Sequence, residues 1–394
     1  MATSTVLVVN SGSSSIKYQL VEPESGACIA KGLIEAIGEP HGHAKHTYGD
    51  VSAELDEVIA DHTRGMAIME HFFDEVGPKL LESNIVAVGH RIVQGGKYFS
   101  GPALINDEVY DRIVQLCPLG PLHNPAHLKG IDAARKIFPD LPHVAVFDTA
   151  FFQGLPEEAA RYALKREVAD KYEIRRYGAH GTSHQFVSGE VSRLLGRDDL
   201  KQIVLHLGNG ASASAVVNGQ AVETSMGLTP LEGLVMGGRT GDIDPAAVFH
   251  LMRQANMTAD ELDTLFNKES GLKGLTGDND MRKVHERMDA GDTNAIEAFD
   301  IYIHRLLKYV GAYTAVMGGL DVITFTAGVG ENDYLTRQAL CERLAYMGVV
   351  IDEEANKVRS GEPRTISTPE STVRIMVVPT NEEEAIARQA MTLV

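Results

Sequence analysis

The sequence predicts an α/β protein built from two related domains, and three observations lead to this prediction. The chain has 394 residues, which is long for a single domain. Short runs rich in β-branched residues alternate with helix-like segments, as in α/β proteins. A strand, a turn rich in Gly or Ser and two further strands occur near residue 6 and again roughly 200 residues later, which indicates an internal duplication. The spacing of this repeat places a domain boundary near residue 150.

The first half begins with a predicted strand, a turn and two more strands. The strands are expected at residues 6–9, 16–21 and 28–34, with the Gly/Ser-rich turn at 10–15. Apolar residues at helical spacing then predict a helix within 52–76. The remaining elements expected in this half are a strand at 85–88, a helix at 125–138 and a strand at 143–147.

The second half repeats the opening pattern. Strands are expected at 203–207, 211–217 and 220–225, with glycines at 208–210 and an Asn218-Gly219 hairpin turn between the last two. A long amphipathic helix is expected at 293–317, followed by a strand at 322–325 and the glycine-containing segment 328–330.

Composition excludes several classes of protein. With 36 Lys+Arg against 54 Asp+Glu, the net charge is −18, so we expect no nucleic-acid or anionic-membrane partner. The three cysteines (Cys28, Cys117 and Cys341) have neither disulfide nor metal-site spacing. No run of 18 apolar residues occurs. We therefore expect a cytoplasmic protein.

The turn between Asn10 and Lys17 is a candidate phosphate site. Small Gly and Ser residues let backbone N–H groups approach a polyphosphate closely, and Lys17 adds a positive charge. The turn leads into a strand and the P-loop pattern is absent, so this is not a P-loop. An ordinary Gly/Ser hairpin remains the alternative interpretation.

Residues 208–213 match the dinucleotide pattern G-x-G-x-x-A after a strand. That fingerprint requires a following helix, whose N-terminus faces the pyrophosphate. Here a strand is expected next, so we do not expect a Rossmann site.

Two arginines and two acids stand at candidate ligand positions. Arg91 follows a buried strand and Arg239 lies among glycines, where a guanidinium is free to bind a carboxylate or phosphate. Asp148 follows a strand and Glu382 precedes a helix, and carboxylates in such places suit Mg²⁺. The alternatives are surface arginines in loops and, for Glu382, an ordinary helix N-terminus.

Two groups of histidines resemble metal sites. His180 and His184 are four residues apart, but we expect Gly181 to break the helix that would align them. His180 is therefore interpreted as a polar donor and His184 as structural. Histidines 41, 43 and 46 are expected in a polar loop and receive no role.

Together these features suit phosphoryl transfer from ATP with Mg²⁺, which depends on positioning and charge neutralisation. The chain resembles the acetokinase family, which belongs to the actin/Hsp70/sugar-kinase superfold. The resemblance covers nearly the whole chain. The motifs that carry it are 9–17 (VNSGSSSIK), 89–93 (GHRIV), 147–151 (FDTAF), 176–184 (RYGAHGTSH), 206–210 (HLGNG), 238–245 (GRTGDIDP), 328–332 (GVGEN) and 379–382 (PTNE).

The resemblance implies two duplicated ribonuclease-H-like domains of the actin/Hsp70/hexokinase type, with ATP in the cleft between them. Residues 1–150 and about 383–394 would form the N-terminal domain, and 151–382 the C-terminal nucleotide-binding domain. The residues that would bind ATP are Lys17, His206, Leu207, Gly208, Asn209, Gly210, Asp280, Met281, Arg282, Gly328, Val329, Gly330, Glu331 and Asn332.

The same resemblance assigns the reacting groups. Arg91 and Arg239 would bind the substrate carboxylate and the transferring phosphoryl group, and His180 would donate to its oxygens. Asn10 and Glu382 would hold Mg²⁺, with Mn²⁺ as an alternative cation. Asp148 stands at the family's acid/base position. Because acetate is already ionised near neutral pH, ordering a metal-bound water or Arg91 is its expected task.

The implied reaction is reversible transfer of the γ-phosphoryl group of ATP to acetate, giving acetyl phosphate and ADP, in a homodimer. Val93, Leu122 and Pro230 would wall the acyl pocket. Ala179 stands where the family usually has Phe, so propionate or butyrate remains an alternative acceptor, since one methylene changes binding by only about 1–3 kcal/mol. A superfold relative that uses ATP to switch partners is the alternative of a different class.

Overall fold

The computed structural model describes residues 3–394, which divide into two compact units. The first unit contains the described residues up to Gln153 together with Asn381–Val394. The second unit is Gly154–Thr380. The expected domain limits, near residue 150 and at about residue 383, stay a prediction.

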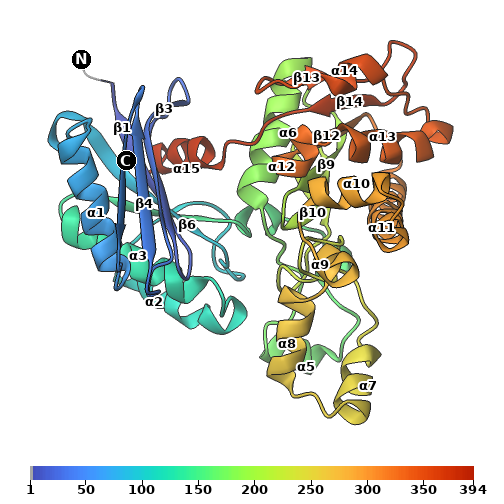
Figure 1. The fold of residues 1–394 in the computed structure, drawn as a ribbon, viewed down its shortest axis with the longest axis horizontal. Helices are drawn as coiled ribbons and strands as arrows, with labels where there is room; N and C mark the ends of the chain where they lie inside the picture. Colours follow the sequence, from blue (N-terminus) through green and yellow to red (C-terminus); the bar gives the residue numbers. More distant parts are fainter. Residues whose placement is uncertain (1–2) are drawn as a thin grey trace. The chain divides into compact units, whose positions relative to one another are not determined.

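The first unit is an eight-stranded sheet with helices on both faces (Figure 1). The sheet order is β5-β4-β3-β2-β1-β6-β8-β7. Its strands are β1 (Thr5–Ser11), β2 (Ile16–Glu22), β3 (Ala27–Glu35), β4 (Gly42–Tyr48), β5 (Val51–Glu57), β6 (Ile85–Ile92), β7 (Ala103–Leu104) and β8 (His143–Phe147). Its helices are α1 (His62–Glu75), α2 (Asp107–Gln115), α3 (Asn124–Ile137) and α15 (Glu382–Met391), with short 3₁₀ turns at Leu80–Glu82, Cys117–Leu119 and Ala150–Phe152.

Strand β1 is apolar throughout because both faces of the sheet are covered around it. Leu7 and Val9 belong to the core on the face of α1 and α3. Val6 and Val8 point to the other face, where they pack with Ile386 of α15. The C-terminal helix is therefore part of the core of the first unit.

The second unit contains a six-stranded sheet of order β11-β10-β9-β12-β14-β13. Its strands are β9 (Lys201–Leu207), β10 (Ala211–Val217), β11 (Gln220–Thr224), β12 (Val322–Thr326), β13 (Arg364–Thr365) and β14 (Arg374–Val377). Its helices are α4 (Glu157–Ala160), α5 (Arg166–Lys171), α6 (Gly181–Leu195), α7 (Ala246–Gln254), α8 (Ala259–Lys268), α9 (Gly271–Thr276), α10 (Met281–Asp289), α11 (Thr293–Met317), α12 (Ala327–Asn332), α13 (Tyr334–Arg343) and α14 (Glu353–Lys357), with a 3₁₀ turn at Ala345–Met347.

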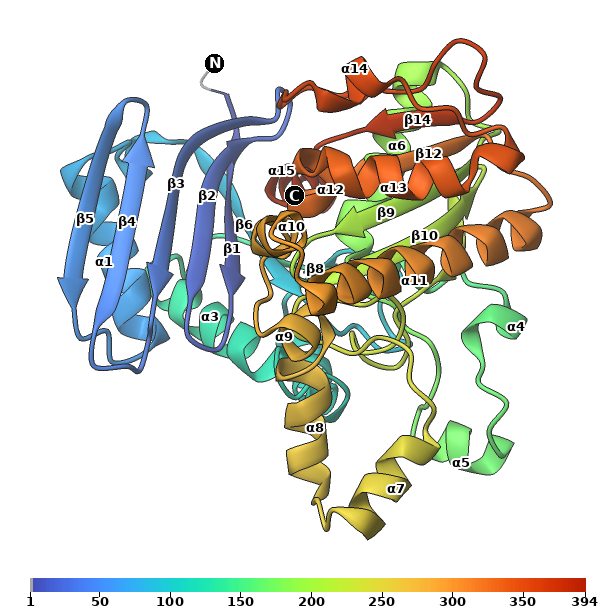
Figure 2. The same cartoon turned by 45° about the vertical axis from the view of Figure 1, so that its right-hand side comes forward.

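Helices also cover both faces of the second sheet. Figure 2 shows α11 lying along the sheet, and this helix contributes to the large core that contains Leu205 of β9. Val187 and Val191 of α6 pack on the opposite face with Val204. The long helix expected at 293–317 is thus confirmed, and its apolar stripe faces the sheet.

The two sheets share one topology. In the first, β3, β2 and β1 are antiparallel, and β1 is then followed by the parallel strands β6 and β8. In the second, β11, β10 and β9 are antiparallel, and β9 is followed by the parallel strands β12 and β14. The predicted duplication of an α/β unit is confirmed by this correspondence.

The predicted helix at 52–76 is wrong in its first part. Residues Val51–Glu57 form the edge strand β5, in which more and less exposed residues alternate with the period of two that a strand requires. Asp61 caps α1, and its side chain accepts a hydrogen bond from the N–H of Arg64 at 2.8 Å. Apolar spacing between 55 and 59 fits both periods, so it did not distinguish them.

The polar loop expected around 41–46 is also wrong, because Gly42–Tyr48 forms β4. His46 is fully buried and its ring nitrogens bond the Tyr18 hydroxyl and the Gly77 carbonyl, each at 2.9 Å. His43 pairs with Asp56 of β5 at 2.7 Å. These histidines therefore stabilise the sheet. Among residues 3–394, no group of three or more His, Cys, Asp and Glu side chains could hold a metal ion.

A buried histidine pair links β6 to β8. The rings of His90 and His143 stack at 5.2 Å, their facing nitrogens are 2.9 Å apart, and Nε2 of His143 bonds the Phe138 carbonyl at 3.0 Å. Burial lowers the pKa of both histidines, and for His90 the neighbouring His143 lowers it further. Both rings are therefore neutral in the folded protein near neutral pH.

This pair predicts a loss of stability in acid. The unfolded histidines bind protons below pH about 6.5 while the folded pair resists protonation, so the free energy of unfolding should fall as pH decreases below that value. Each proton involved contributes up to about 1.4 kcal/mol per pH unit. Urea unfolding between pH 7.5 and 5 should show a shallower pH dependence for His90→Gln than for the unsubstituted chain. Equal slopes would exclude the pair as a source of acid sensitivity.

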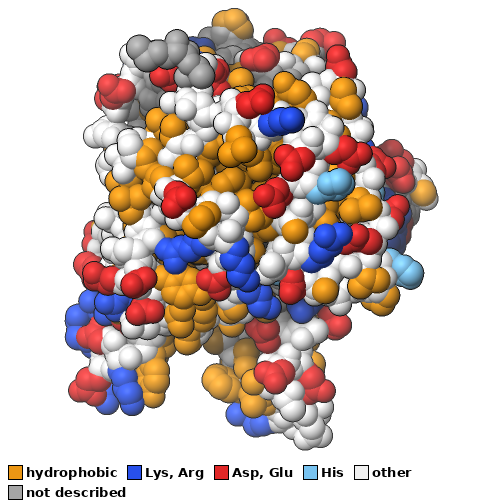
Figure 3. Space-filling view, turned by 90° about the vertical axis from the view of Figure 1, so that its left-hand side faces the viewer, with side chains coloured by type: hydrophobic (Ala, Val, Ile, Leu, Met, Phe, Trp, Pro, Cys, Tyr) orange, Lys and Arg blue, Asp and Glu red, His pale blue; other side chains and the backbone are white. Residues whose placement is uncertain are grey.

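The surface carries charges of both signs. On the face in Figure 3, acidic and basic side chains are interspersed and hydrophobic side chains gather near the centre. The net charge of −18 is therefore not concentrated on that face. None of the helices among residues 3–394 is long and apolar enough to cross a membrane.

Candidate active site

In the first unit, four of the predicted site residues stand at the ends of elements around β1, β6 and β8. Asn10 and Arg91 lie near the carboxyl ends of β1 and β6, and Asp148 directly follows β8. Glu382 is the first residue of α15. The carboxyl ends of parallel strands form the usual ligand-binding edge of an α/β sheet. The topology therefore gathers these side chains at one edge.

Arg91 lies between two carboxylates. Its Nη2 is 2.7 Å from Oδ2 of Asp148, and its Nε is 3.2 and 3.1 Å from the two oxygens of the same carboxylate. Its Nε is also 3.7 Å from Oε2 of Glu382. Asp148 is only 1% exposed, so this fork-shaped pair is shielded from water. The structure thus brings Arg91, Asp148 and Glu382 into one cluster.

Burial and charge act in opposite directions on this cluster. Burial lowers the pKa of Arg91, but Asp148 and Glu382 outweigh it, so this pKa lies above its ordinary value. Burial raises the pKa of Glu382, and Arg91 only partly offsets this effect. Arg91 therefore stays positively charged, while Glu382 is less ready to ionise than a surface glutamate.

Asn10 and Lys17 are opposite each other in the β1–β2 hairpin. The turn between them is closed by a 2.7 Å hydrogen bond from the N–H of Gly12 to the carbonyl of Ser15. Lys17 forms an ion pair with Glu383, the neighbour of Glu382, and remains half exposed. Lys17 is thus tied to the start of α15 and still accessible to a ligand.

The donors in this cluster fit magnesium. Asn10 offers an amide oxygen, and Asp148 and Glu382 offer carboxylates. Mg²⁺ prefers oxygen ligands and is commonly held by one or two carboxylates together with water and substrate phosphates. The pKa of the buried Glu382 is raised, so the positive charge of Arg91 does not fully offset the cost of burying the Glu382 carboxylate.

In the second unit, a cavity of about 770 Å³ collects many of the predicted ATP-binding residues. This volume lies within the range of small-molecule sites. The predicted residues that line it are Gly208, Asn209, Asp280, Met281, Arg282, Gly328, Val329 and Asn332. The cavity thus joins the turn after β9, the start of α10 and the helix α12 that follows β12.

Five predicted residues lie beside this lining. Leu207 is fully buried in the core, and His206 bonds the Ser183 hydroxyl at 2.8 Å. Glu331 accepts hydrogen bonds from the N–H groups of Ala327 at 2.8 Å and Thr380 at 3.2 Å. Gly210 and Gly330 are adjacent to the lining segments, and they do not line the cavity. Ligand contacts by these five stay a prediction.

Other residues line the cavity without having been predicted. His285 and Asp333 form a 2.8 Å ion pair there, and Tyr302 contributes a buried phenol. The further lining residues are Gly237, Leu272, Asn279, Tyr334, Leu335 and Arg359. Of the unpredicted lining residues, Leu272, His285, Tyr302, Tyr334 and Leu335 lie on helices. In these helices the sequence shows only amphipathic spacing and gives no sign of a ligand.

His180 and His184 meet at one serine. Nδ1 of His180 and Nε2 of His184 are 2.9 and 2.7 Å from the hydroxyl of Ser212. His184 is fully buried and also bonds Ser214 at 2.7 Å, which agrees with its expected structural role. The expectation that no helix carries both histidines agrees with the structure. His180 has φ of 58° and precedes α6, which begins at Gly181, so only His184 lies on the helix.

Arg239 lies near His180. Both side chains lie beside Gly210: a Cβ added to this glycine would be 3.6 Å from Arg239 Nη1 and 3.6 Å from the His180 ring. Arg239 donates to the Pro230 carbonyl at 3.0 Å, and the sulfur of Met236 is 3.7 Å away. No carboxylate among residues 3–394 forms an ion pair with Arg239, and burial lowers its pKa. Its positive charge is therefore not compensated.

The expected acyl-pocket residues come from both units. Val93 is buried and Leu122 is half exposed in the first unit, while Pro230 and Ala179 belong to the second. Ala179 is 2% exposed and packs in the core of the second unit. The role of these residues in selecting an acid stays a prediction.

Comparison with known proteins gives one consistent family. The sequence profile of the acetokinase family matches residues 5–388. The chain belongs to the acetokinase family. It is 53% identical to the acetate kinase of Streptomyces avermitilis, with 100% of this chain and 98% of that protein covered. It is 54% identical to the acetate kinase of Leifsonia xyli, with 99% of both chains covered.

Solved structures agree with this family. The acetate kinase of Porphyromonas gingivalis has a TM-score of 0.94 at 43% identity, covering 99% of both chains. A propionate kinase of Francisella tularensis has a TM-score of 0.93 at 41% identity, covering 99% of this chain and 100% of that one. The prediction of the actin/Hsp70/sugar-kinase fold and of the acetokinase family is therefore confirmed.

Proposed function

We propose that this member of the acetokinase family is an acetate kinase, which reversibly transfers the γ-phosphoryl group of ATP to acetate and yields acetyl phosphate and ADP. The observation that carries the proposal is the similarity to acetate kinases over the whole chain. The two clusters of site residues support it, because one suits a nucleotide and the other a carboxylate with a metal ion.

The cavity of the second unit is the proposed nucleotide site. Gly208 and Gly328 have no side chains, so backbone N–H groups there can approach phosphates closely. Arg282 and Asp280 stand at the start of α10, where they hydrogen-bond each other at 2.6 Å. Arg239 and His180 would stabilise the transferring phosphoryl group. The guanidinium of Arg239 forms no ion pair among the described residues, so its positive charge is available to the phosphoryl oxygens.

The arginine cluster of the first unit is the proposed carboxylate site. Arg91 presents a planar fork that matches a carboxylate or a phosphoryl group. Asp148 holds that fork in place through two nitrogens of the guanidinium. Because acetate is ionised at neutral pH, the reaction needs no base, and we assign Asp148 the task of orienting Arg91. The reaction requires both clusters to act on one phosphoryl group.

Asn10 and Glu382 are the residues that would hold Mg²⁺. When bound, the ion would neutralise phosphate charge during transfer. Mn²⁺ has similar ligand preferences and is an alternative. The homodimer, the cytoplasmic location and the position of ATP between two domains stay predictions that the family suggests.

A propionate kinase is the second candidate. The substitution that favours it is Ala179, which stands beside His180 where the family usually has Phe. The structural similarity to a propionate kinase agrees with either acceptor. A small residue could leave room for one further methylene, which is worth only about 1–3 kcal/mol in discrimination.

Replacing Ala179 by Phe should therefore sharpen the preference for acetate. We expect the ratio of kcat/KM for acetate to that for propionate to rise by roughly 10-fold, the effect of about one methylene. Because Ala179 is buried, the larger ring could also cost about 1–3 kcal/mol of stability, so Tm must be measured on the same preparation. An unchanged ratio in a folded variant would exclude position 179 from the acyl pocket.

The proposed function is tested by incubating the chain with ATP, Mg²⁺ and acetate, propionate or butyrate and trapping the acyl phosphate with hydroxylamine. The highest kcat/KM on acetate is expected. A preference for propionate or butyrate would support the second candidate. Binding of ATP without any acyl phosphate would contradict both and would favour an ATP-dependent switch protein.

A further inference from the structure

Arg239 lies on a long connection between β11 and α7. Among the described residues, its guanidinium hydrogen-bonds the carbonyl of Pro230 and the sulfur of Met236, which belong to the same connection. No ion pair among the described residues fixes this side chain. The position of Arg239 therefore depends on the conformation of the loop that carries it.

This loop is closed at a narrow neck between Gly233 and Asp242. The N–H of Asp242 donates to the Gly233 carbonyl, and the N–H of Gly233 donates to Oδ1 of Asp242, each at 2.9 Å. Gly233 has φ of 111°, and a Cβ there would lie 2.6 Å from the Ser225 carbonyl oxygen. The neck thus needs glycine and closes the loop 233–242 at its base. Further along the loop, Gly238 accepts a hydrogen bond from the N–H of Ser270 at 3.0 Å, and the N–H of Thr240 donates to the Phe266 carbonyl at 3.1 Å.

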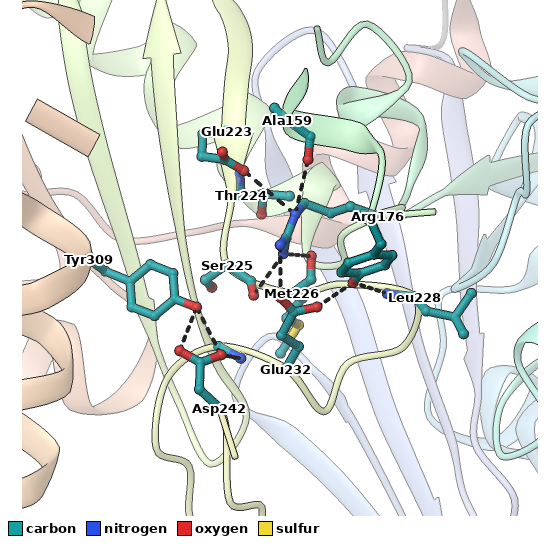
Figure 4. A network of polar contacts seen from close by, with 12 residues as sticks. Ala159, Arg176, Glu223, Thr224, Ser225, Met226, Leu228, Glu232, Asp242 and Tyr309 are labelled. Atoms are coloured by element: carbon teal, nitrogen blue, oxygen red, sulfur yellow. Dashed lines mark hydrogen bonds and ion pairs between the residues drawn. The ribbon is translucent and has the colours of Figure 1, made fainter. Parts of the chain in front are cut away.

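Two side chains of α11 hold this neck from outside the loop. Nη1 of Arg305 donates to the Gly233 carbonyl at 2.8 Å, and Nη2 donates to the Asp242 carbonyl at 3.2 Å. The Tyr309 hydroxyl is 3.1 and 3.0 Å from the two oxygens of Asp242 (Figure 4). Arg305 and Tyr309 are four residues apart, so they share one face of the helix.

A second group of contacts holds the segment just before the neck. Nη2 of Arg176 bonds Oε1 of Glu232 at 2.8 Å, and its Nη1 bonds the carbonyls of Ser225 and Met226 at 3.3 and 3.2 Å (Figure 4). Tyr162 donates to Glu232 and accepts from the N–H of Leu228 at 3.1 Å. The segment with Pro230, which accepts the bond from Arg239, is therefore fixed as well.

We infer that Arg305 and Tyr309 are positioning residues for Arg239, acting through the neck Gly233–Asp242. Neither residue lines the nucleotide cavity. Their effect would be to keep the Arg239 guanidinium at one place and thereby lower the cost of ordering it for phosphoryl transfer. The inference rests on the proposed function, because it assigns these residues to the same reaction.

The test is Tyr309→Phe, which removes the hydroxyl bound to Asp242 and keeps the ring. We expect kcat for acyl-phosphate formation from ATP and acetate to fall roughly 10-fold, a size typical of one hydrogen bond to a charged group. The KM for ATP should stay within about twofold. The reason is that Gly237, the loop residue that lines the nucleotide cavity, is held by a different hydrogen bond, from its N–H to the Asn209 carbonyl at 2.9 Å.

Tyr313→Phe is the matched control. Tyr313 lies one turn further along α11 and is buried, and its hydroxyl has no hydrogen-bond partner among residues 3–394. This variant should keep the kcat of the unsubstituted chain. Tm is measured for both variants, so that a loss of folded protein is separated from a loss of turnover.

A double-mutant cycle distinguishes positioning from general destabilisation. If Tyr309 acts through Arg239, Tyr309→Phe should lower kcat much less in an Arg239→Lys background than in the unsubstituted chain. An equal loss in both backgrounds, or no loss in the single variant, would overturn the inference. If the unsubstituted chain forms no acyl phosphate, the proposed function fails and the inference fails with it.

Discussion

Arg91→Ala is expected to reduce acyl-phosphate formation by roughly 10³-fold, because a positioned cationic donor is commonly worth 10²–10³ in turnover and Arg91 also orders Asp148. The substitution leaves the buried Asp148 and Glu382 without their shared cation, and the loss of Arg91 should raise the pKa of Glu382 further. Steady-state kinetics at saturating ATP and acetate measure the loss of turnover.

The same substitution should lower stability, since removing one partner of a buried ion pair costs about 3–5 kcal/mol. Urea unfolding checks this expectation. Arg193→Ala is the matched control, because Arg193 is exposed and pairs with Glu190 within the surface of α6. Near-normal turnover in Arg91→Ala would remove Arg91 from the mechanism, and Arg91→Lys tests whether charge alone is sufficient.

Arg239→Ala is expected to lower turnover by roughly 10²–10³-fold with little change in stability. The contrast with Arg91 follows from their partners: no carboxylate among residues 3–394 forms an ion pair with Arg239, so its removal leaves no such partner unpaired. The lost contacts are the hydrogen bond to the Pro230 carbonyl and the contact with the Met236 sulfur. Turnover and Tm measured together should therefore separate the two arginines.

Arg253 provides the control for this experiment. It is an exposed arginine of α7 in the same unit, and Arg253→Ala should leave turnover unchanged. Added guanidinium should partly restore the turnover of Arg239→Ala, because the cavity left by the side chain is small and polar groups remain around it. Full activity of Arg239→Ala without added guanidinium would contradict the proposed role.

The strands next to glycine turns were predictable from the sequence. β8 and β9 are short apolar runs followed directly by Asp148 and Gly208, and the Asn218-Gly219 turn after β10 has the positive φ values of 52° and 76° that such a turn requires. Strand β4 and the edge strand β5 were missed because many of their residues are polar and partly exposed. β4 is stabilised by pairing with β3, and β5 by pairing with β4, which the local sequence does not reveal.

The site was predictable to a similar extent. Gly208, Arg91 and Arg239 stand in short motifs; in the structure Gly208 lines the cavity, Arg91 bonds Asp148 and Arg239 bonds the Pro230 carbonyl, and their roles stay predictions. His285 and Tyr302 line the cavity from helices that pack together only in the folded unit. Residues of this kind carry no local signal, because their position depends on which helix faces meet.

The position of α15 has a consequence for protein synthesis. The helix covers one face of the first sheet, with Ile386 against the backbone of Gly89, yet it is synthesised only after the whole second unit, Gly154–Thr380. Most of the first unit is thus synthesised early but keeps an apolar face uncovered until α15 has been made. The same helix supplies Glu382 and Glu383, so a chain that stops before residue 382 lacks both a core element and a proposed ligand of the metal ion.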